Sequence, residues 1–181
     1  MKLSKIFLLC AFVLVCGGFV SCSDDDDNVQ SAPLTNNTWM SYVDDTEVNV
    51  EVSDPAIKES VEEFVNSYRA GFRLKLSILA PDYEYVFGED GQYTFTEKRF
   101  NIEEDKKTNG TYTYSEKTNT ISFGDPTISG LKDNHILYIT TDLRSRAADS
   151  LEIEIDKITK AEVKEKYTSM AYYYGEYPGT Y

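Results

Sequence analysis

Hydrophobic residues recur at helical spacing between Asp54 and Gly71. Charged residues occupy the opposite face of this segment, and Pro55 suits the first turn of a helix. Asp54 can cap the helix, and Gly71 can end it. The apolar stripe comprises Ile57, Val61, Phe64, Val65 and Tyr68. The pattern therefore predicts a half-exposed helix that lays one stripe against another part of the protein.

Beyond Gly71 the hydrophobic period changes from helical spacing to strict alternation. This alternation predicts a strand over residues 72–78 with one solvated face. Further β-rich runs predict strands over residues 83–87, 92–100, 111–115, 120–123, 135–143 and 151–158, and turn residues separate them at 88–91, 109–110, 117–119 and 146–149. Short strands with tight connections favour an antiparallel meander that closes into a barrel or forms a sandwich.

The C-terminal region predicts a second helix and an aromatic tail. Thr159 and Glu162 have the spacing of a capping box, and Val163, Tyr167 and Met170 share one helical face. Consecutive tyrosines cannot all point inward from one strand, so the tail either closes the end of the barrel or presents rings to a ligand. The candidate ligand-binding residues of this tail are Tyr172, Tyr173, Tyr174 and Tyr177.

The N-terminal segment has the pattern of a secretory signal. Lys2 and Lys5 precede an apolar run over residues 6–15, which is too short to span a bilayer comfortably. Residues 19–21 before Cys22 resemble a lipobox, with Phe in place of the usual Leu at the outermost position. The resemblance implies cleavage after a signal of residues 1–21 and a stable lipid anchor on Cys22. An ordinary signal peptide with an incidental cysteine is the alternative.

An acidic tether follows the predicted lipidation site. Residues 22–34 are polar without periodicity, which is typical of a disordered linker. The tether opens with Ser23, Asp24, Asp25, Asp26 and Asp27. Such a run resembles the surface-export signal of Bacteroidetes lipoproteins and implies a place on the outside of the outer membrane. A solvating spacer is the alternative, and a calcium site is disfavoured because four adjacent acids repel one another.

Cysteine content and net charge exclude several functions. Cys10 and Cys16 leave with the signal and Cys22 is used by lipid, so the mature domain has no thiol for disulfides, metals or catalysis. Subtracting Lys2 and Lys5 from 18 basic residues leaves 16 against 31 acidic ones, a formal charge of −15. This charge opposes binding to nucleic acid and electrostatic association with anionic lipid head groups.

Several short motifs resemble lipocalin-like lipoproteins of the Bacteroidetes. They are the aromatic hairpin of residues 85–95, the Gly-Thr-Tyr strand of residues 109–114, the Ile-containing strand of residues 120–123, and Trp39 after Thr38. The resemblance spans residues 35–158. It implies an antiparallel barrel of about eight strands with an inserted amphipathic helix. Together with the C-terminal helix expected from Thr159 and Glu162, this gives a mainly β domain over residues 35–181. The resemblance carries over no catalytic residue.

Catalytic chemistry is poorly represented in the sequence. His135 is the only histidine, so paired histidine ligands for a metal are missing, and no Gly-x-Ser-x-Gly elbow occurs. Glu152, Glu154 and Asp156 alternate with apolar residues and would share one face of the strand predicted over residues 151–158. A hydrolase that uses these carboxylates is therefore the least favoured alternative, and no cofactor is expected.

The sequence favours a non-enzymatic, surface-displayed module that binds a small hydrophobic ligand, a glycan or an envelope protein. The alternative is a structural or accessory subunit of an envelope complex whose barrel is fully packed. Fourteen tyrosines and nine phenylalanines are expected mainly to fill the barrel interior. Ser150, between Asp149 and Leu151, also resembles an acceptor for O-glycosylation in this bacterial group.

Overall fold

The computed structural model describes residues 31–42, 45–69, 82–98 and 104–172. These residues form nine strands: β1 (Thr38–Ser41), β2 (Thr46–Val52), β3 (Tyr83–Phe87), β4 (Gln92–Glu97), β5 (Lys106–Ser115), β6 (Thr120–Phe123), β7 (Ile128–Asp133), β8 (Ile136–Asp142) and β9 (Ile158–Ser169). The helices are η2 (Pro55–Ile57), α1 (Lys58–Arg69), α2 (Arg144–Leu151) and η3 (Ile155–Lys157). Among these described helices, none combines the length and apolarity that crossing a membrane would require.

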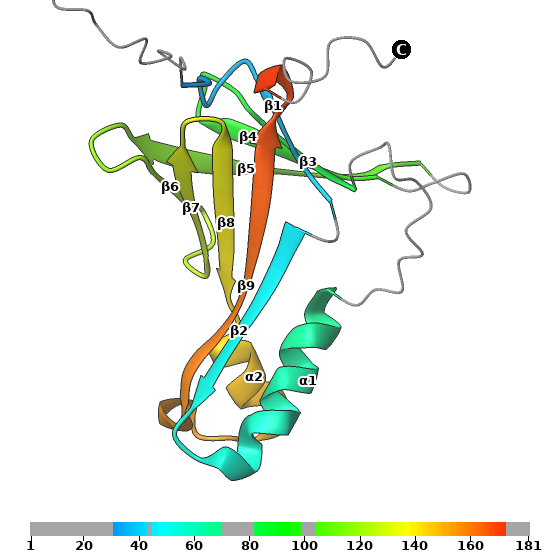
Figure 1. The fold of residues 1–181 in the computed structure, drawn as a ribbon, viewed down its shortest axis with the longest axis vertical. Helices are drawn as coiled ribbons and strands as arrows, with labels where there is room; N and C mark the ends of the chain where they lie inside the picture. The colour runs from blue at the N-terminus through cyan, green and yellow to red at the C-terminus, as the bar shows by residue number, and fades with distance from the viewer. Residues whose placement is uncertain (1–30, 43–44, 70–81, 99–103, 173–181) are drawn as a thin grey trace, which may run out of the picture.

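Eight of the strands close into an antiparallel barrel (Figure 1). Strands β3 to β9 pair in chain order, and β1 closes the ring by pairing with both β3 and β9. Trp39 of β1 lies opposite Ser169 of β9, whereas Thr46 of β2 lies opposite Glu165. Strand β2 therefore continues the line of β1 along β9 as a ninth strand. The predicted mainly β, antiparallel barrel is confirmed.

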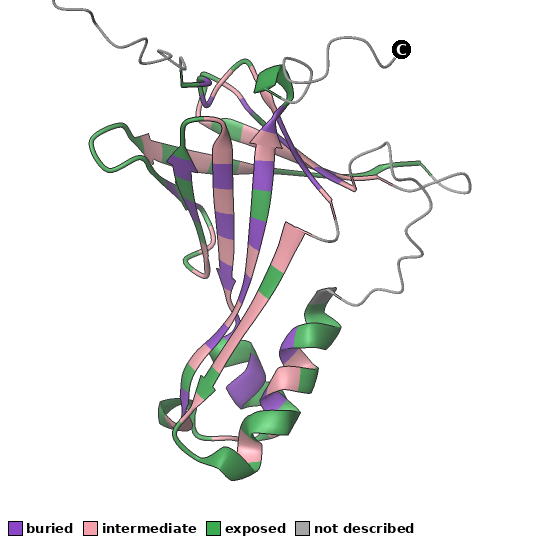
Figure 2. Ribbon diagram, in the orientation of Figure 1, coloured by how far each residue is buried: buried purple, intermediate pink, exposed green. Residues whose placement is uncertain are grey.

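Two hydrophobic clusters stabilise the molecule (Figure 2). The first fills the barrel with rings and aliphatic side chains from the strands, and it includes Trp39, Tyr85 and Leu137. The second lies where β2 and the first half of β9 extend beyond the barrel and pack against α1 and α2, and it includes Val61 and Val163. Helices α1 and α2 therefore lie together at one end of the long axis.

Helix α1 forms as its sequence pattern predicts. Asp54 accepts a 2.9 Å hydrogen bond from the backbone amide of Ala56 and so caps η2, the short 3-10 helix that leads directly into α1. Val61 and Val65 of the predicted stripe are fully buried, while Tyr68 at the end of the stripe is 44% exposed. Gly71, the predicted end of the helix, lies outside the described residues, as does the strand predicted over residues 72–78.

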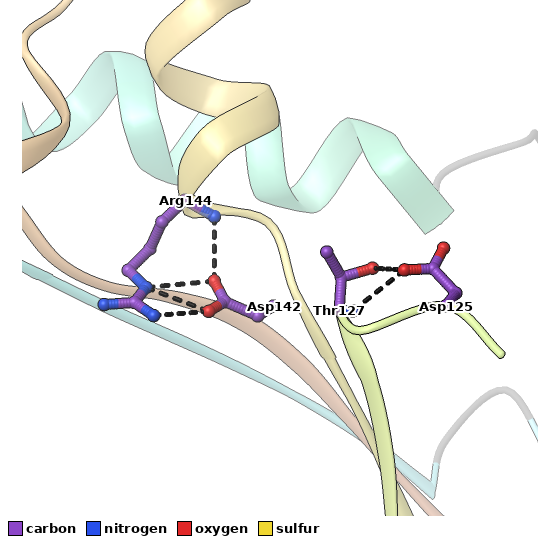
Figure 3. Close-up of polar contacts among 4 residues, drawn as sticks. All are labelled: Asp125, Thr127, Asp142 and Arg144. Atoms are coloured by element: carbon purple, nitrogen blue, oxygen red, sulfur yellow. Dashed lines mark hydrogen bonds and ion pairs between the residues drawn. The ribbon is translucent and has the colours of Figure 1, made fainter. Parts of the chain in front are cut away.

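Hydrogen bonds and charges join the helical end to the barrel. Arg146 of α2 lies 3.6 Å from Asp125 Oδ2 and donates a 3.0 Å hydrogen bond to the hydroxyl of Tyr68 on α1. The neighbouring Asp142 accepts hydrogen bonds from the backbone amide and guanidinium of Arg144 at 2.6–3.1 Å (Figure 3). The first set of contacts thus links the turn before β7 to both helices, and the second links the end of β8 to the start of α2.

The structure corrects the element predicted over residues 151–158. This segment is not a strand: Leu151 ends α2, Glu152 adopts a left-handed conformation with φ 55°, and residues 155–157 form η3. The turn predicted at residues 146–149 is also wrong, because those residues lie inside α2, where Ala147 and Ala148 are buried. A left-handed residue after a helix ends it and prevents the regular extension that a strand requires.

The predicted second helix is a strand instead. Residues 158–169 form β9, and its buried positions alternate along the strand. Val163 and Tyr167 are four residues apart, a spacing that fits one helical face and one strand face equally well. A single helical turn begins only at Met170, and the residues beyond Tyr172 lie outside the described part of the chain.

Several other strand boundaries differ from the sequence prediction, most of all that of β5. Strand β5 begins at Lys106, so Asn109 and Gly110 lie inside it and do not form the predicted turn. A Cβ atom on Gly110 would lie 2.6 Å from the ring of Tyr93, directly opposite on β4. The glycine at this position therefore serves close packing of an aromatic ring, not a change of direction. Strands β2 and β7 were not predicted.

Candidate functional site

The middle of the barrel is filled by aromatic rings around Tyr85. Its ring centroid lies 4.8–5.9 Å from those of five other rings, Phe87, Phe95, Tyr93, Phe123 and Tyr167. These separations are those of rings in direct contact. The rings come from β3, β4, β6 and β9 and so cross the interior. The expectation that aromatic side chains fill the barrel is confirmed for these residues.

A glycine on β7 allows aliphatic side chains to meet inside the barrel. A Cβ atom on Gly130 would lie 2.9 Å from Ile121 Cβ and 3.2 Å from Ile139 Cδ1. Both isoleucine side chains are only 1% exposed. Since real Cβ atoms essentially never approach a neighbour this closely, the wall of the barrel has no spare space at this level.

The N-terminal segment closes one end of the barrel. Ala32 and Leu34 are 4% and 5% exposed and belong to the barrel core. The indole nitrogen of Trp39 donates a 3.0 Å hydrogen bond to the carbonyl of Leu34, and Ser31 Oγ accepts a 2.7 Å bond from the ammonium of Lys132. Residues 31–34 therefore form a plug that is held to the wall by packing and hydrogen bonds, so this last part of the linker predicted over residues 22–34 is ordered and belongs to the barrel.

Two charged side chains face the barrel interior, and sequence analysis missed both. Lys132 on β7 is 8% exposed, and Glu165 on β9 is 4% exposed. Burial lowers the pKa of the Lys132 ammonium, and the nearby carboxylate of Asp133 partly opposes this shift. Both residues occupy inward-facing positions of their strands, along which side chains alternate between the two faces. This alternation was the sequence signal that could have located them.

The predicted tyrosine platform is described only at its first residue. Tyr172 stacks on His135, with ring centroids 4.8 Å apart and planes inclined by 25°. Its backbone amide donates a 3.4 Å hydrogen bond to Ser169 Oγ. The other candidate tyrosines, Tyr173, Tyr174 and Tyr177, lie outside the described residues.

His135 is paired with a serine at the same end of the barrel. Its Nδ1 lies 3.1 Å from Ser169 Oγ, and the backbone amide of Ser169 donates to the carbonyl of His135. Ser169 is completely buried, so its hydroxyl is not accessible to a substrate. The pair ties the residue that precedes β8 to the end of β9 and supports the interpretation of His135 as a strand-end residue.

The acidic residues of the hydrolase alternative do not share a strand face. Glu152 follows α2, Glu154 precedes η3 and Asp156 lies within η3. All three are exposed, and Glu154 forms an ion pair with Lys157 at 3.0 Å. The predicted row of carboxylates is therefore wrong. Within the described ranges, no three potential metal-binding side chains of His, Cys, Asp or Glu come together.

A polar groove of about 210 Å³ lies on the outer wall where β2, β9 and β8 run side by side. Its lining residues are Asp45, Glu47, Tyr138, Lys164 and Lys166. Register places Lys164 opposite Glu47 on one side and Thr140 on the other, while Lys166 lies opposite Tyr138. The groove thus has acidic residues on one side, lysines along its floor and an aromatic ring on the other side.

The groove lysines differ from the neighbouring lysine on the same face of β9. Lys164 Nζ lies 4.4 Å from the centroid of the Tyr138 ring, a cation–π distance. Neither Lys164 nor Lys166 forms an ion pair with a described residue, whereas Lys160 lies 3.8 Å from both Glu51 and Glu162. In a strongly acidic chain, this leaves two ammonium groups available to a ligand.

A second and more open hollow lies on the outside beside β1 and β3. It measures about 400 Å³ and is lined by Asn36, Asn37, Thr38, Val86, Met170 and Ala171. Val86 and Met170 are 42% and 40% exposed. Charged side chains are absent from this lining, so the hollow offers contact area but few groups that would orient a ligand.

The export residues Cys22, Ser23, Asp24, Asp25, Asp26 and Asp27 lie outside the described part of the chain. Ser150 is exposed near the end of α2. No protein-family model, no curated protein and no solved structure matches the chain. The class that the fold defines is a closed, eight-stranded antiparallel barrel with a ninth strand and a helical end.

Proposed function

We propose that the protein is a lipid-anchored, non-enzymatic binding module of the bacterial cell envelope, and that it binds a glycan on its outer wall. The groove of Asp45, Glu47, Tyr138, Lys164 and Lys166 carries this proposal. Surface display on the outer membrane, as a lipocalin-like lipoprotein, is part of it. The sequence around Cys22 and the acidic run that follows support the anchor and the location.

The interior of the barrel is a poor place for a ligand. Six rings meet around and including Tyr85, and an added methyl group at Gly130 would already clash with Ile121. A small hydrophobic ligand at this level would have to displace rings that pack against one another, which costs their dispersion contacts. The outer wall is therefore the better candidate for recognition.

The groove offers the groups that a sugar ring requires. Ammonium groups donate hydrogen bonds to hydroxyl oxygens, and carboxylates accept them from hydroxyl protons. Lys164 and Glu47 lie directly opposite one another on β9 and β2, so neighbouring hydroxyls of one sugar can meet both. The ring of Tyr138 supplies an apolar surface for the C–H groups of the sugar when the Lys164 ammonium, which lies 4.4 Å from the ring centroid, turns from the ring to a sugar hydroxyl. The size of the groove suits one sugar unit of a longer chain.

Saturation-transfer NMR with methyl glycosides of glucose, galactose, mannose and N-acetylglucosamine tests the proposal. We expect at least one glycoside to bind, and Tyr138→Ala or Lys164→Ala to weaken it by about tenfold, or about 1.4 kcal/mol. Lys160→Ala is the matched control, because Lys160 lies on the same face of β9 but is paired with Glu51 and Glu162. Absence of binding to every glycoside, or equal loss in the control, contradicts a glycan site here.

A second candidate is an accessory subunit of an envelope complex with a packed barrel. The ring packing around Tyr85 and Phe87 supports it, because such an interior serves as a rigid scaffold. Native mass spectrometry of the detergent-extracted, full-length protein distinguishes the two candidates. A stoichiometric complex with a second protein favours the accessory role, and a monomer that binds a glycoside favours the module.

A further inference from the structure

We infer that the barrel end closed by the plug of residues 31–34 faces the membrane, and that the helical end of α1 and α2 points away from it. This orientation rests on the proposed lipid anchor at Cys22. It identifies the lipid surface as the neighbour of one end of the barrel and leaves the opposite end to partners outside the membrane.

The anchor leaves the folded domain at a fixed point. Ser31 Oγ donates to the carbonyl of Asn134 at 3.3 Å and accepts from Lys132 Nζ at 2.7 Å. Ala32 and Leu34 behind it are buried in the barrel core. Figure 1 shows the described chain beginning at the end of the long axis opposite the helices. The plug therefore cannot slide to lengthen the connection without breaking core contacts.

The connection is short compared with the domain. Eight residues lie between Cys22 and Ser31, and the nine Cα–Cα steps of a fully extended chain between them reach about 30 Å. Strand β9 runs from the helical cluster, where Ile158 packs, to the plugged end, where Ser169 pairs with Trp39. Its 12 residues cover roughly 40 Å. The plugged end is thus held close to the bilayer, while the helical end lies farther away than the connection can reach.

Charge disfavours an orientation in which the domain lies flat on the membrane. Exposed acids at the helical end include Asp54, Glu59, Glu63, Asp149, Glu152, Glu154 and Asp156. Bacterial membrane surfaces carry anionic lipid head groups, which repel such a surface within a Debye length. The repulsion on the helical end acts only if that end approaches the bilayer, so it disfavours the flat orientation.

Energy transfer from the domain to the membrane plane tests the orientation. The lipidated protein, which has no other mature cysteine, is reconstituted in phosphatidylethanolamine–phosphatidylglycerol vesicles that contain acceptor-labelled lipid. A donor is attached to Asp133→Cys, beside the plug, or to Ser60→Cys on α1; both positions are exposed. We expect transfer from Asp133→Cys to exceed that from Ser60→Cys roughly twofold or more, because about 40 Å separates the two ends.

A second pair of labelled positions controls for a local disturbance that the label causes at one position. Lys117→Cys lies in the turn between β5 and β6, and Asp156→Cys lies in η3; both are exposed. The same ranking in both pairs supports the orientation. Equal transfer, or stronger transfer from the helical positions, overturns it while leaving the anchor intact. Protein that fails to float with the vesicles overturns the anchor and, with it, both proposals.

Discussion

Lys132 and Ser31 lie 101 residues apart in sequence and are joined by a 2.7 Å hydrogen bond at the closed end of the barrel. The ammonium of Lys132 is buried in the wall, and the hydroxyl of Ser31 belongs to the plug. The bond satisfies a charged donor that has been withdrawn from water, and it fixes the place where the proposed anchor leaves the domain.

Ser31→Ala removes this acceptor from the buried ammonium. We expect a loss of about 1–3 kcal/mol in the free energy of unfolding, because a buried charged donor loses a partner. Urea denaturation at neutral pH measures the loss. Ser129→Ala, an exposed change on β7, the strand that carries Lys132, is the control and should alter stability by less than about 0.5 kcal/mol. Equal effects of the two changes would show that the bond contributes nothing.

The substitution Lys132→Met separates the free-energy cost of burying the charge from the stabilisation that the hydrogen bond to Ser31 provides. Burial lowers the pKa of Lys132, so the folded state disfavours its charged form at neutral pH. Methionine has a similar length and no charge, so we expect Lys132→Met to be neutral or stabilising and to reduce the effect of Ser31→Ala to that of its remaining hydrogen bond to the carbonyl of Asn134. A full Ser31→Ala penalty in the Lys132→Met background would contradict this coupling.

The decrease in the free energy of unfolding at acidic pH depends on two aspartates near the helical end. Hydrogen bonds from the side chain of Arg144 lower the pKa of Asp142, and those from the hydroxyl and amide of Thr127 lower that of Asp125 (Figure 3). A lowered folded-state pKa means that the unfolded chain binds more protons as pH falls. The stabilisation is therefore complete above the unfolded value of 3.8 and is lost as pH falls through the folded value.

The substitution Asp142→Asn should make stability less dependent on pH in the acidic range. We expect the difference in urea midpoint between the native protein and the variant to shrink as pH falls from about 6 to about 3. Asp149→Asn, an exposed aspartate of α2, serves as the control and should leave the midpoint difference small throughout. A constant gap between native protein and Asp142→Asn across this range would contradict the assignment.

Truncation of a side chain in the barrel interior tests whether the interior has space for a ligand. Phe87 is 1% exposed and contacts the ring of Tyr112 edge-on at 4.9 Å, whereas the adjacent Val86 is 42% exposed. We expect Phe87→Ala to cost about 3–5 kcal/mol and Val86→Ala less than about 0.5 kcal/mol. Guanidinium denaturation of both variants provides the comparison. A small loss at Phe87 would indicate a loosely filled barrel and would favour an interior ligand.

Gly130 gives the opposite test, because there a side chain is added. We expect Gly130→Ala to destabilise by about 1–3 kcal/mol, since the new methyl group would meet Ile121 and Ile139. Gly124→Ala is the control: its Cβ would approach only the hydroxyl of Thr111, at 3.3 Å. A stabilising Gly130→Ala, measured by thermal unfolding, would show unfilled volume beside β7.

The sequence predicts those parts of the fold in which hydrophobic period and end signals agree. The helix that Asp54 caps and the strands at residues 83–87 and 120–123 were predicted correctly because each pattern fits only one element. Strand β9 was predicted as a helix because Val163 and Tyr167 satisfy both periods. Its membership of the barrel depends on pairing with β8, which local sequence does not encode.

The missed strands have physical explanations as well. The inward positions of β7 are Ile128, Gly130 and Lys132, so its buried face does not look hydrophobic in sequence. Strand β2 carries an alternation of Val48, Val50 and Val52 that was available and was overlooked. The groove could not be predicted, because it joins residues 45–47, 138 and 164–166 through the register of three strands.

Analysis of the mature N-terminus tests the lipid-anchored character of the protein most directly. Mass spectrometry of protein extracted from membranes should find an N-terminal peptide that begins at Cys22 and carries acyl chains. Cys22→Ala should retain the uncleaved signal and lose this modified peptide. An unmodified N-terminus at any other residue in the native protein would contradict the anchor, the proposed location and the orientation inferred from it.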